Sequence, residues 1–247
     1  MQLINRVFLV GGGLSGFGLS HDSDCHVYLI DGGEEAVLID AGAGLGRDEI
    51  LANIKNHGID PDKISLLLLT HLHADHSGGA AGLREVLPDL KVGAAEDMAF
   101  ALRQGDERAI GLTHGKQGGY YEEGYYFRPC PVDLELIDGQ ELTVGQVGLR
   151  VIATPGHSAG HLCFLMDDGG RRYLFTGDNL FFGGKILLQP VPDCNLQEHL
   201  SSLRKLNGLG VDVFLPGHGA FSLSQGQRHI FEALSWMDRC LVPPSYI

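Results

Sequence analysis

Short apolar runs recur along the chain, each bounded by glycine, proline or charged residues. Runs of this length between turn-forming residues predict buried strands. Ile64 to Leu69, with the sequence ISLLLL, is the clearest example, because such a dense apolar run is typical of a strand buried on both faces. The same pattern predicts strands at about residues 6–10, 26–30, 36–40, 149–152, 173–175 and 211–214.

A second pattern, with apolar residues three and four positions apart, predicts helices between the strands. In residues 47–56, Ile50, Leu51 and Ile54 lie on one face, and Gly58 stops the helix. The pattern predicts further helices near residues 78–87, 96–103, 196–207 and 225–239.

The stretch VGGGLSGFG, residues 10–18, has the G-x-G-x-x-G spacing of dinucleotide-binding loops. Such a loop must open a helix, because the helix N-terminus binds the pyrophosphate. Residues 17–25 show no helical stripe, and Asp31-Gly32-Gly33 is typical of a hairpin turn between the two strand-like runs that follow. A hairpin makes these strands antiparallel, whereas the dinucleotide fold requires a parallel pair. We therefore expect Asp31 to be a turn residue and the stretch to bind no dinucleotide.

Residues 104–131 form a long segment with many glycines and no clear period. The segment is too long for an ordinary connection, which favours a lid or pocket wall inserted into a single domain of residues 1–247. A surface loop or a subunit contact is the alternative. Its four tyrosines are Tyr120, Tyr121, Tyr125 and Tyr126. Strands resume after it, and Asp138-Gly139 predicts a second hairpin turn.

The composition limits the classes of molecule that the protein is expected to bind. The net charge of −13 opposes binding to nucleic acid or to an anionic membrane surface, since both require clustered Lys and Arg. The five cysteines never form C-x-x-C, which disfavours a thiolate zinc site and a disulfide framework. The first residues lack a signal-peptide pattern, and no apolar run approaches membrane length. We expect a soluble, cytoplasmic protein that acts on a small-molecule substrate and can form a homodimer.

Side chains that could bind a metal are concentrated in the sequence THLHADHSGG, which directly follows the strand at 64–69. Residues two apart on an extended segment point the same way, so His71 and His73 can converge on one ion. A turn then brings Asp75 and His76 to a second position. Isolated histidines are usually surface or packing residues, but four ligand-type side chains at this spacing favour a metal site.

Three later segments repeat the arrangement of a strand followed by a ligand-type residue on a glycine loop. His157 follows the strand at 149–152, Asp178 follows 173–175, and His218 follows 211–214. Sites in α/β proteins assemble at such strand ends. We therefore expect these three residues to join the histidines of the first segment.

Together these residues resemble the metallo-β-lactamase fold superfamily, whose H-x-H-x-D-H motif and later single His, Asp and His are present in order. The resemblance implies a four-layer αββα sandwich of two mixed β-sheets flanked by helices. It implies a two-metal centre, in which one ion binds His71, His73 and His157 and the other binds Asp75, His76 and His218. Asp178 would bridge the two ions. His161 and Asp40 are expected to support these ligands.

The resemblance also implies hydrolysis by a metal-bridging hydroxide, since metal-bound water reaches a pKa of about 7. Asp75 would pass a proton to the leaving group, so Asp75 and Asp178 are the expected catalytic carboxylates. Five imidazoles and two carboxylates suit zinc first, with iron or manganese as alternatives. The expected substrate is a small carbonyl ester, thioester or lactone, as in enzymes similar to glyoxalase II or to the lactonases.

Several alternatives remain from the sequence. A β-lactamase with a cysteine ligand would need Cys in place of Asp178, and the chain lacks it. An iron-dependent persulfide dioxygenase and a phosphodiesterase share the resembled fold, and a metal-binding protein without catalysis is a further possibility. Substrate contacts are expected from Phe17 in the glycine-rich stretch, from Tyr120 or Tyr121, and from Lys185, which follows the Asp178 loop.

Overall fold

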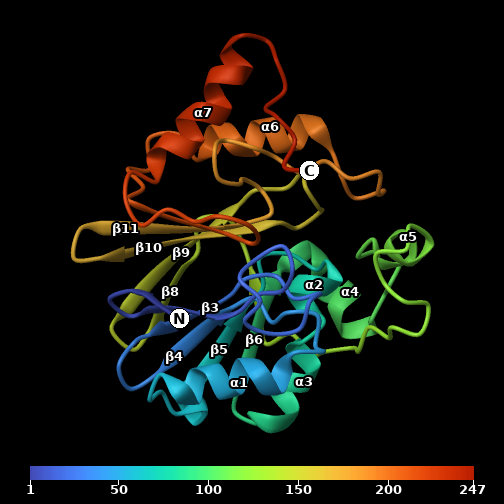
Figure 1. Ribbon diagram of the computed structural model, residues 1–247, viewed down its shortest axis with the longest axis vertical. Helices are drawn as coiled ribbons and strands as arrows, with labels where there is room; N and C mark the ends of the chain where they lie inside the picture. Colours follow the sequence, from blue (N-terminus) through green and yellow to red (C-terminus); the bar gives the residue numbers. More distant parts are fainter.

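The computed structural model describes residues 1–247, which form two mixed β-sheets packed face to face with helices outside (Figure 1). The larger sheet has the order β1-β2-β3-β4-β5-β6-β7. Its first four strands pair antiparallel and its last four pair parallel, with β4 common to both groups. The strands are β1 (Gln2–Ile4), β2 (Val7–Gly11), β3 (Val27–Asp31), β4 (Ala36–Ile39), β5 (Ile64–Leu68), β6 (Lys91–Ala95) and β7 (Leu134–Leu136).

The smaller sheet has the order β12-β11-β10-β9-β8. Only its β11–β12 pair is parallel, and the other pairs are antiparallel. The strands are β8 (Glu141–Val144), β9 (Val147–Ala153), β10 (Leu162–Asp168), β11 (Arg171–Gly177) and β12 (Val213–Pro216). Both sheets are therefore mixed, as the resemblance to the metallo-β-lactamase fold implied.

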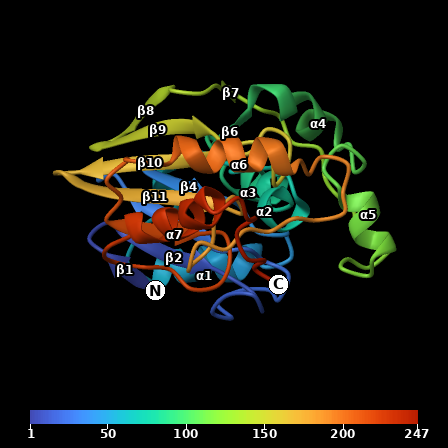
Figure 2. The same cartoon turned by 90° about the horizontal axis from the view of Figure 1, so that it is seen from above.

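Helices cover both outer faces and complete the αββα sandwich. The helices α1 (Arg47–Asn56) and α3 (Ala80–Val86) lie below the larger sheet in Figure 1, and α6 (Leu196–Lys205) and α7 (Gln227–Asp238) lie above the smaller one. Figure 2 shows α6 and α7 across the strands of the smaller sheet, with α5 (Leu112–Gln117) standing out at the side. Two shorter helices are α2 (Ala74–Ser77) and α4 (Ala99–Gln104), and 3-10 turns cover Pro61–Lys63 and Glu96–Met98. No helix has both the length and the apolar character needed to cross a bilayer.

The main core fills the space between the sheets, and a second core lies under α6 and α7. Successive residues in the strands of the smaller sheet alternate between the two cores. Val151 and Phe164 point into the main core, whereas Ile152 and Cys163 point into the second. The central strands are therefore buried on both faces, which explains their dense apolar runs.

The structure corrects three details of the sequence-based picture. Asp75 and His76 lie on the short helix α2 rather than on a turn, and the helix predicted at 78–87 begins at Ala80. Asp138-Gly139 joins no hairpin, because β7 before it belongs to the larger sheet and β8 after it belongs to the smaller one. The chain crosses between the two layers at this turn. The true hairpin is β8–β9, which turns at Gly145.

The glycine-rich stretch 10–18 runs from the end of β2 into a loop that precedes β3. The strands β2, β3 and β4 are antiparallel neighbours, so the parallel unit of a dinucleotide fold is absent, as predicted. The glycines allow close packing instead: a Cβ on Gly13 would lie 2.1 Å from the Asp22 carbonyl oxygen, and one on Gly16 would lie 2.7 Å from His26 Nε2.

Candidate metal centre

The predicted ligands converge because their strands end at the same edge of the two sheets. The strands β5, β9, β11 and β12 are each followed within a few residues by one or more of them. The residues brought together are His71, His73, Asp75, His76, His157, Asp178 and His218, the complete set expected from the sequence.

The first donor set consists of three imidazoles. The donor nitrogens of His71, His73 and His157 lie within 4.8 Å of one another. His73 Nδ1 and His157 Nε2 are 3.0 Å apart. His71 and His157 are fully or almost fully buried. Such a cluster of nitrogen lone pairs suits a divalent cation with a preference for imidazole.

The second donor set mixes imidazole and carboxylate. His218 Nε2 lies 3.0 Å from Asp75 Oδ2 and 3.3 Å from His76 Nε2. The donor atoms of Asp75, His76 and His218 again lie within 4.8 Å of one another. Two of its members come from α2, and the third follows β12.

Asp178 contacts both sets. Its Oδ2 lies 3.7 Å from His157 Nε2 of the first set and 3.6 Å from His218 Nε2 of the second. Its Oδ1 is buried without a hydrogen-bond partner, 3.3 Å from His76 Nε2. Gly217 makes room for it, because a Cβ there would lie 2.3 Å from Asp178 Oδ1. The side chains fit the bridging arrangement that the sequence suggested.

Hydrogen bonds behind the ligands fix which ring nitrogen faces the centre. His157 Nδ1 donates to the Leu187 carbonyl oxygen at 3.0 Å, and His76 Nδ1 donates to Asp40 Oδ2 at 2.8 Å. The Thr70 hydroxyl lies 3.1 Å from His71 Nδ1 and donates to Asp40. Asp40 therefore supports ligands of both sets, as expected.

Electrostatics differ between the two sets. Burial and neighbouring imidazoles lower the pKa of His71 well below its usual range, and burial lowers the pKa of His157 to about 3. Burial also opposes protonation of His76 and His218, but the Cys25 thiol near His76 and the carboxylates around both raise their pKa values. Burial opposes ionisation of Asp75 and Asp178, yet the adjacent imidazoles lower the pKa of both. His71 and His157 are thus held neutral, as cation binding by imidazole requires, whereas the second set combines two imidazoles with the ionised carboxylate of Asp75.

Comparison with known proteins agrees with this geometry. The model of the metallo-β-lactamase superfamily matches residues 22–218, which contain every ligand. The chain belongs to this superfamily. Superfamily structures confirm the fold: a subclass B3 metallo-β-lactamase of Bradyrhizobium japonicum superposes with a TM-score of 0.72 at 23% identity, covering 97% of this chain and 91% of that one. The enzyme from Legionella gormanii superposes with a TM-score of 0.70 at 21% identity, covering 97% and 94%.

Relatives in sequence carry names that specify a reaction. An atrochrysone carboxyl ACP thioesterase of Aspergillus fumigatus is 32% identical over 82% of this chain and 53% of its own length. The thioesterase pkgB of Emericella nidulans is 30% identical over 78% of this chain and 45% of its own. The chain thus spans about half the length of the curated relatives it matches.

One carboxylate beside this candidate metal centre was not anticipated from the sequence. Asp193 Oδ2 lies 3.3 Å from His73 Nε2, and the Asp193 side chain is only 10% exposed. Burial opposes its ionisation, but His73 lowers its pKa. Asp193 stands in a loop before α6 with no periodic pattern around it, so the sequence offered no signal.

The segment 104–131 contacts the second set through one tyrosine. The Tyr121 hydroxyl donates to Asp75 Oδ1 at 3.1 Å and accepts from the Asp75 backbone N–H at 3.1 Å. Tyr120 is instead 79% exposed, and its side chain forms no hydrogen bond with a ligand. Lys185 is exposed and forms no ion pair. The structure brings only Tyr121 of these three expected substrate contacts against a ligand.

Phe17 lies beside the second set. Its ring is 5.6 Å from that of His26 and 5.3 Å from that of Phe221, and His26 is 6.5 Å from His218. Phe17 keeps 48% of its surface exposed. The Gly219 N–H, one residue beyond His218, donates to the Ser15 carbonyl oxygen at 2.7 Å. The glycine-rich loop therefore forms an aromatic margin of the centre.

Tyr246 approaches the same margin from the end of the sequence. Its ring stacks on Phe181 at 4.1 Å, and a Cβ on Gly219 would lie 2.8 Å from its hydroxyl. The segment is anchored where the Tyr246 N–H donates to the Ile186 carbonyl oxygen at 2.8 Å.

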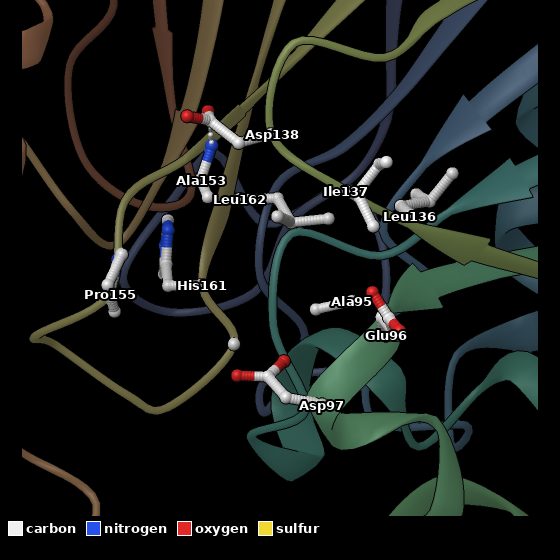
Figure 3. Close-up of a pocket in the computed structure, with 11 residues that line it drawn as sticks. Ala95, Glu96, Asp97, Leu136, Ile137, Asp138, Ala153, Pro155, His161 and Leu162 are labelled. Atoms are coloured by element: carbon white, nitrogen blue, oxygen red, sulfur yellow. Dashed lines mark hydrogen bonds between the residues drawn. The ribbon is translucent and has the colours of Figure 1, made fainter.

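A hollow of about 580 Å³ lies next to the candidate metal centre, and none of the candidate ligands lines it. Figure 3 shows Glu96 and Asp97 on one wall, opposite Pro155 and His161. His161 separates the hollow from the centre, because its ring stacks on His71 at 5.0 Å and its Nε2 accepts from the Asp178 N–H. His161 thus supports Asp178, as expected from the sequence.

Proposed function

We propose that the protein is a two-metal hydrolase of acyl thioesters, with zinc as the metal. The observation that carries the proposal is Asp178, which contacts both donor sets at 3.6–3.7 Å. Two cations held there would supply an activated water and polarise the substrate carbonyl. The thioesterase names of two relatives, in Aspergillus fumigatus and Emericella nidulans, support a thioester among the carbonyl substrates.

The surrounding side chains suit an acyl group. Phe17 and Phe221 form an apolar margin on one side of the second set, and Tyr121 lies on another. Burial of an acyl chain against such rings is favourable by about 25 cal/mol for each Å² removed from water. Asp75 contacts both Tyr121 and His218, and we assign it the transfer of a proton from the attacking water to the leaving sulfur.

A substrate panel tests the proposal. Metal-free protein is reconstituted with zinc and assayed on an acyl-pantetheine thioester, the matching oxoester, an acyl-homoserine lactone, a β-lactam and bis(4-nitrophenyl) phosphate. We expect the highest kcat/KM with the thioester and about two zinc ions per chain by elemental analysis.

Two results contradict the proposal. Hydrolysis of the phosphodiester alone would exclude a carbonyl substrate. One iron per chain together with oxygen consumption on a persulfide would identify a dioxygenase instead. The Asp89→Ala variant is the control for every ligand variant, because Asp89 is exposed and remote from the hydrogen-bond network of the centre.

A further inference from the structure

We propose that Asp193 is a positioning residue for His73, holding its ring with Nε2 protonated and Nδ1 directed into the first donor set. The inference rests on the proposed metal centre but is independent of the thioester substrate. It assigns a role to the loop between Leu187 and α6, a segment with no ligand of its own.

The two groups have no other partner. His73 Nε2 and both carboxylate oxygens of Asp193 are buried and unpaired elsewhere. They face one another at 3.3 Å. An unpaired buried donor or acceptor costs about 1–3 kcal/mol, and more when charged, so the pair stabilises both members.

The contact that His73 makes through Nδ1, on the side of the ring away from Asp193, shows how the ring is oriented. His73 Nδ1 lies 3.0 Å from His157 Nε2, and His157 uses its own Nδ1 to donate to Leu187. His73 therefore offers Nδ1 to the centre, while His71 and His157 offer Nε2. A neutral imidazole that binds a cation through Nδ1 carries its proton on Nε2, which here faces Asp193 Oδ2 at 3.3 Å.

The pair of His73 and Asp193 is also shielded from solvent. A Cβ on Gly111 would lie 3.6 Å from Asp193 Oδ1 and 3.6 Å from His73 Nε2, so the Gly111 backbone packs over both groups. Gly111 belongs to the segment 104–131, which also supplies Tyr121 to Asp75. Water has little access to the pair, and electrostatic attraction is stronger where water is excluded.

Zinc affinity tests the inference, measured by competition with a chromophoric chelator. We expect Asp193→Ala to bind zinc at its tighter site about 10- to 100-fold more weakly, which is the usual effect of removing such a partner. Asp193→Asn keeps an acceptor oxygen and should lose less than Asp193→Ala. The absorption spectrum of the cobalt-substituted Asp193→Ala protein should shift, because the ring of one ligand is no longer fixed.

The control is Asp89→Ala, which removes an exposed carboxylate. The melting temperature of each metal-free variant shows whether it folds, and Asp193→Asn serves if Asp193→Ala does not. Zinc affinity and a cobalt spectrum unchanged in Asp193→Ala would overturn the inference. Because neither measurement uses a substrate, failure of the thioester proposal would leave this result intact.

Discussion

The two donor sets are built from similar residues but are held in different ways. In the first set a polar group faces each ring from behind: the Thr70 hydroxyl at His71, the Asp193 carboxylate at His73 and the Leu187 carbonyl at His157. In the second set, His218 Nδ1 is buried without a partner. Asp75 of that set is held instead by Tyr121 from a surface segment. The rings of the first set are thus supported from behind, whereas the second set contains a carboxylate and depends on neighbouring loops.

The largest effect is expected at the residue that joins the two sets. Asp178→Ala removes the only carboxylate in contact with both His157 and His218. We expect kcat/KM to fall by about 10³-fold or more, since bound cations contribute several kcal/mol to catalysis. Elemental analysis should also show fewer than two metals per chain. Full activity in Asp178→Ala would refute a bridged centre, with Asp89→Ala as the reference.

The second prediction concerns pH and the margin of the second set. Burial lowers the pKa of His26 to about 4, and His218 adds to this effect. Between pH 6.5 and 4 the unfolded chain therefore binds a proton that the folded protein does not, so stability falls as the pH falls through this window. His26 contributes on the order of 3 kcal/mol to this loss.

Chemical denaturation of metal-free protein measures the effect. The unfolding free energy of His26→Asn should fall less steeply than that of the parent between pH 6.5 and 4. His21→Asn, at an exposed histidine, is the matched control. Equal slopes in parent and His26→Asn would show that His26 is not held neutral in the folded protein.

The third prediction tests the dependence of the second set on the segment 104–131. Tyr121→Phe removes the hydroxyl that donates to Asp75 Oδ1. We expect kcat to fall about tenfold with little change in KM, because a hydrogen bond to a charged group contributes roughly 1.5–3 kcal/mol.

The matched variant is Tyr126→Phe, because Tyr126 is 70% exposed and lies in the same segment. Its kcat should equal that of the parent. If both variants lose activity equally, the segment acts through its fold rather than through the Tyr121 hydroxyl.

The contrast between the sets also explains what could be predicted from the sequence. Ligands such as His71 and His157 directly follow dense apolar strands, so strand direction alone brings them to one edge. Asp193 and Tyr121 reach their partners through loops without periodicity, and their contacts depend on how those loops pack. Tyr121 and Tyr120 are neighbours in sequence, yet one contacts Asp75 and the other is exposed. The layer change at Asp138-Gly139 was missed for a similar reason, since a turn does not specify which sheet receives the next strand.

The smallest effect is expected at the aromatic margin. Phe17→Ala removes the half-exposed ring that packs on His26 and Phe221, without touching a metal ligand. We expect KM for a long-chain acyl thioester to rise about fivefold, equivalent to roughly 1 kcal/mol of apolar contact, with kcat little changed. Phe17→Leu should restore most of the affinity, and Phe100→Ala, at a phenylalanine that is 70% exposed, should have no effect. An unchanged KM in Phe17→Ala for both short and long acyl chains would show that the glycine-rich loop only supports the position of His218. In that case the second set would depend on its loops for structure alone, and acyl recognition would lie elsewhere around the centre.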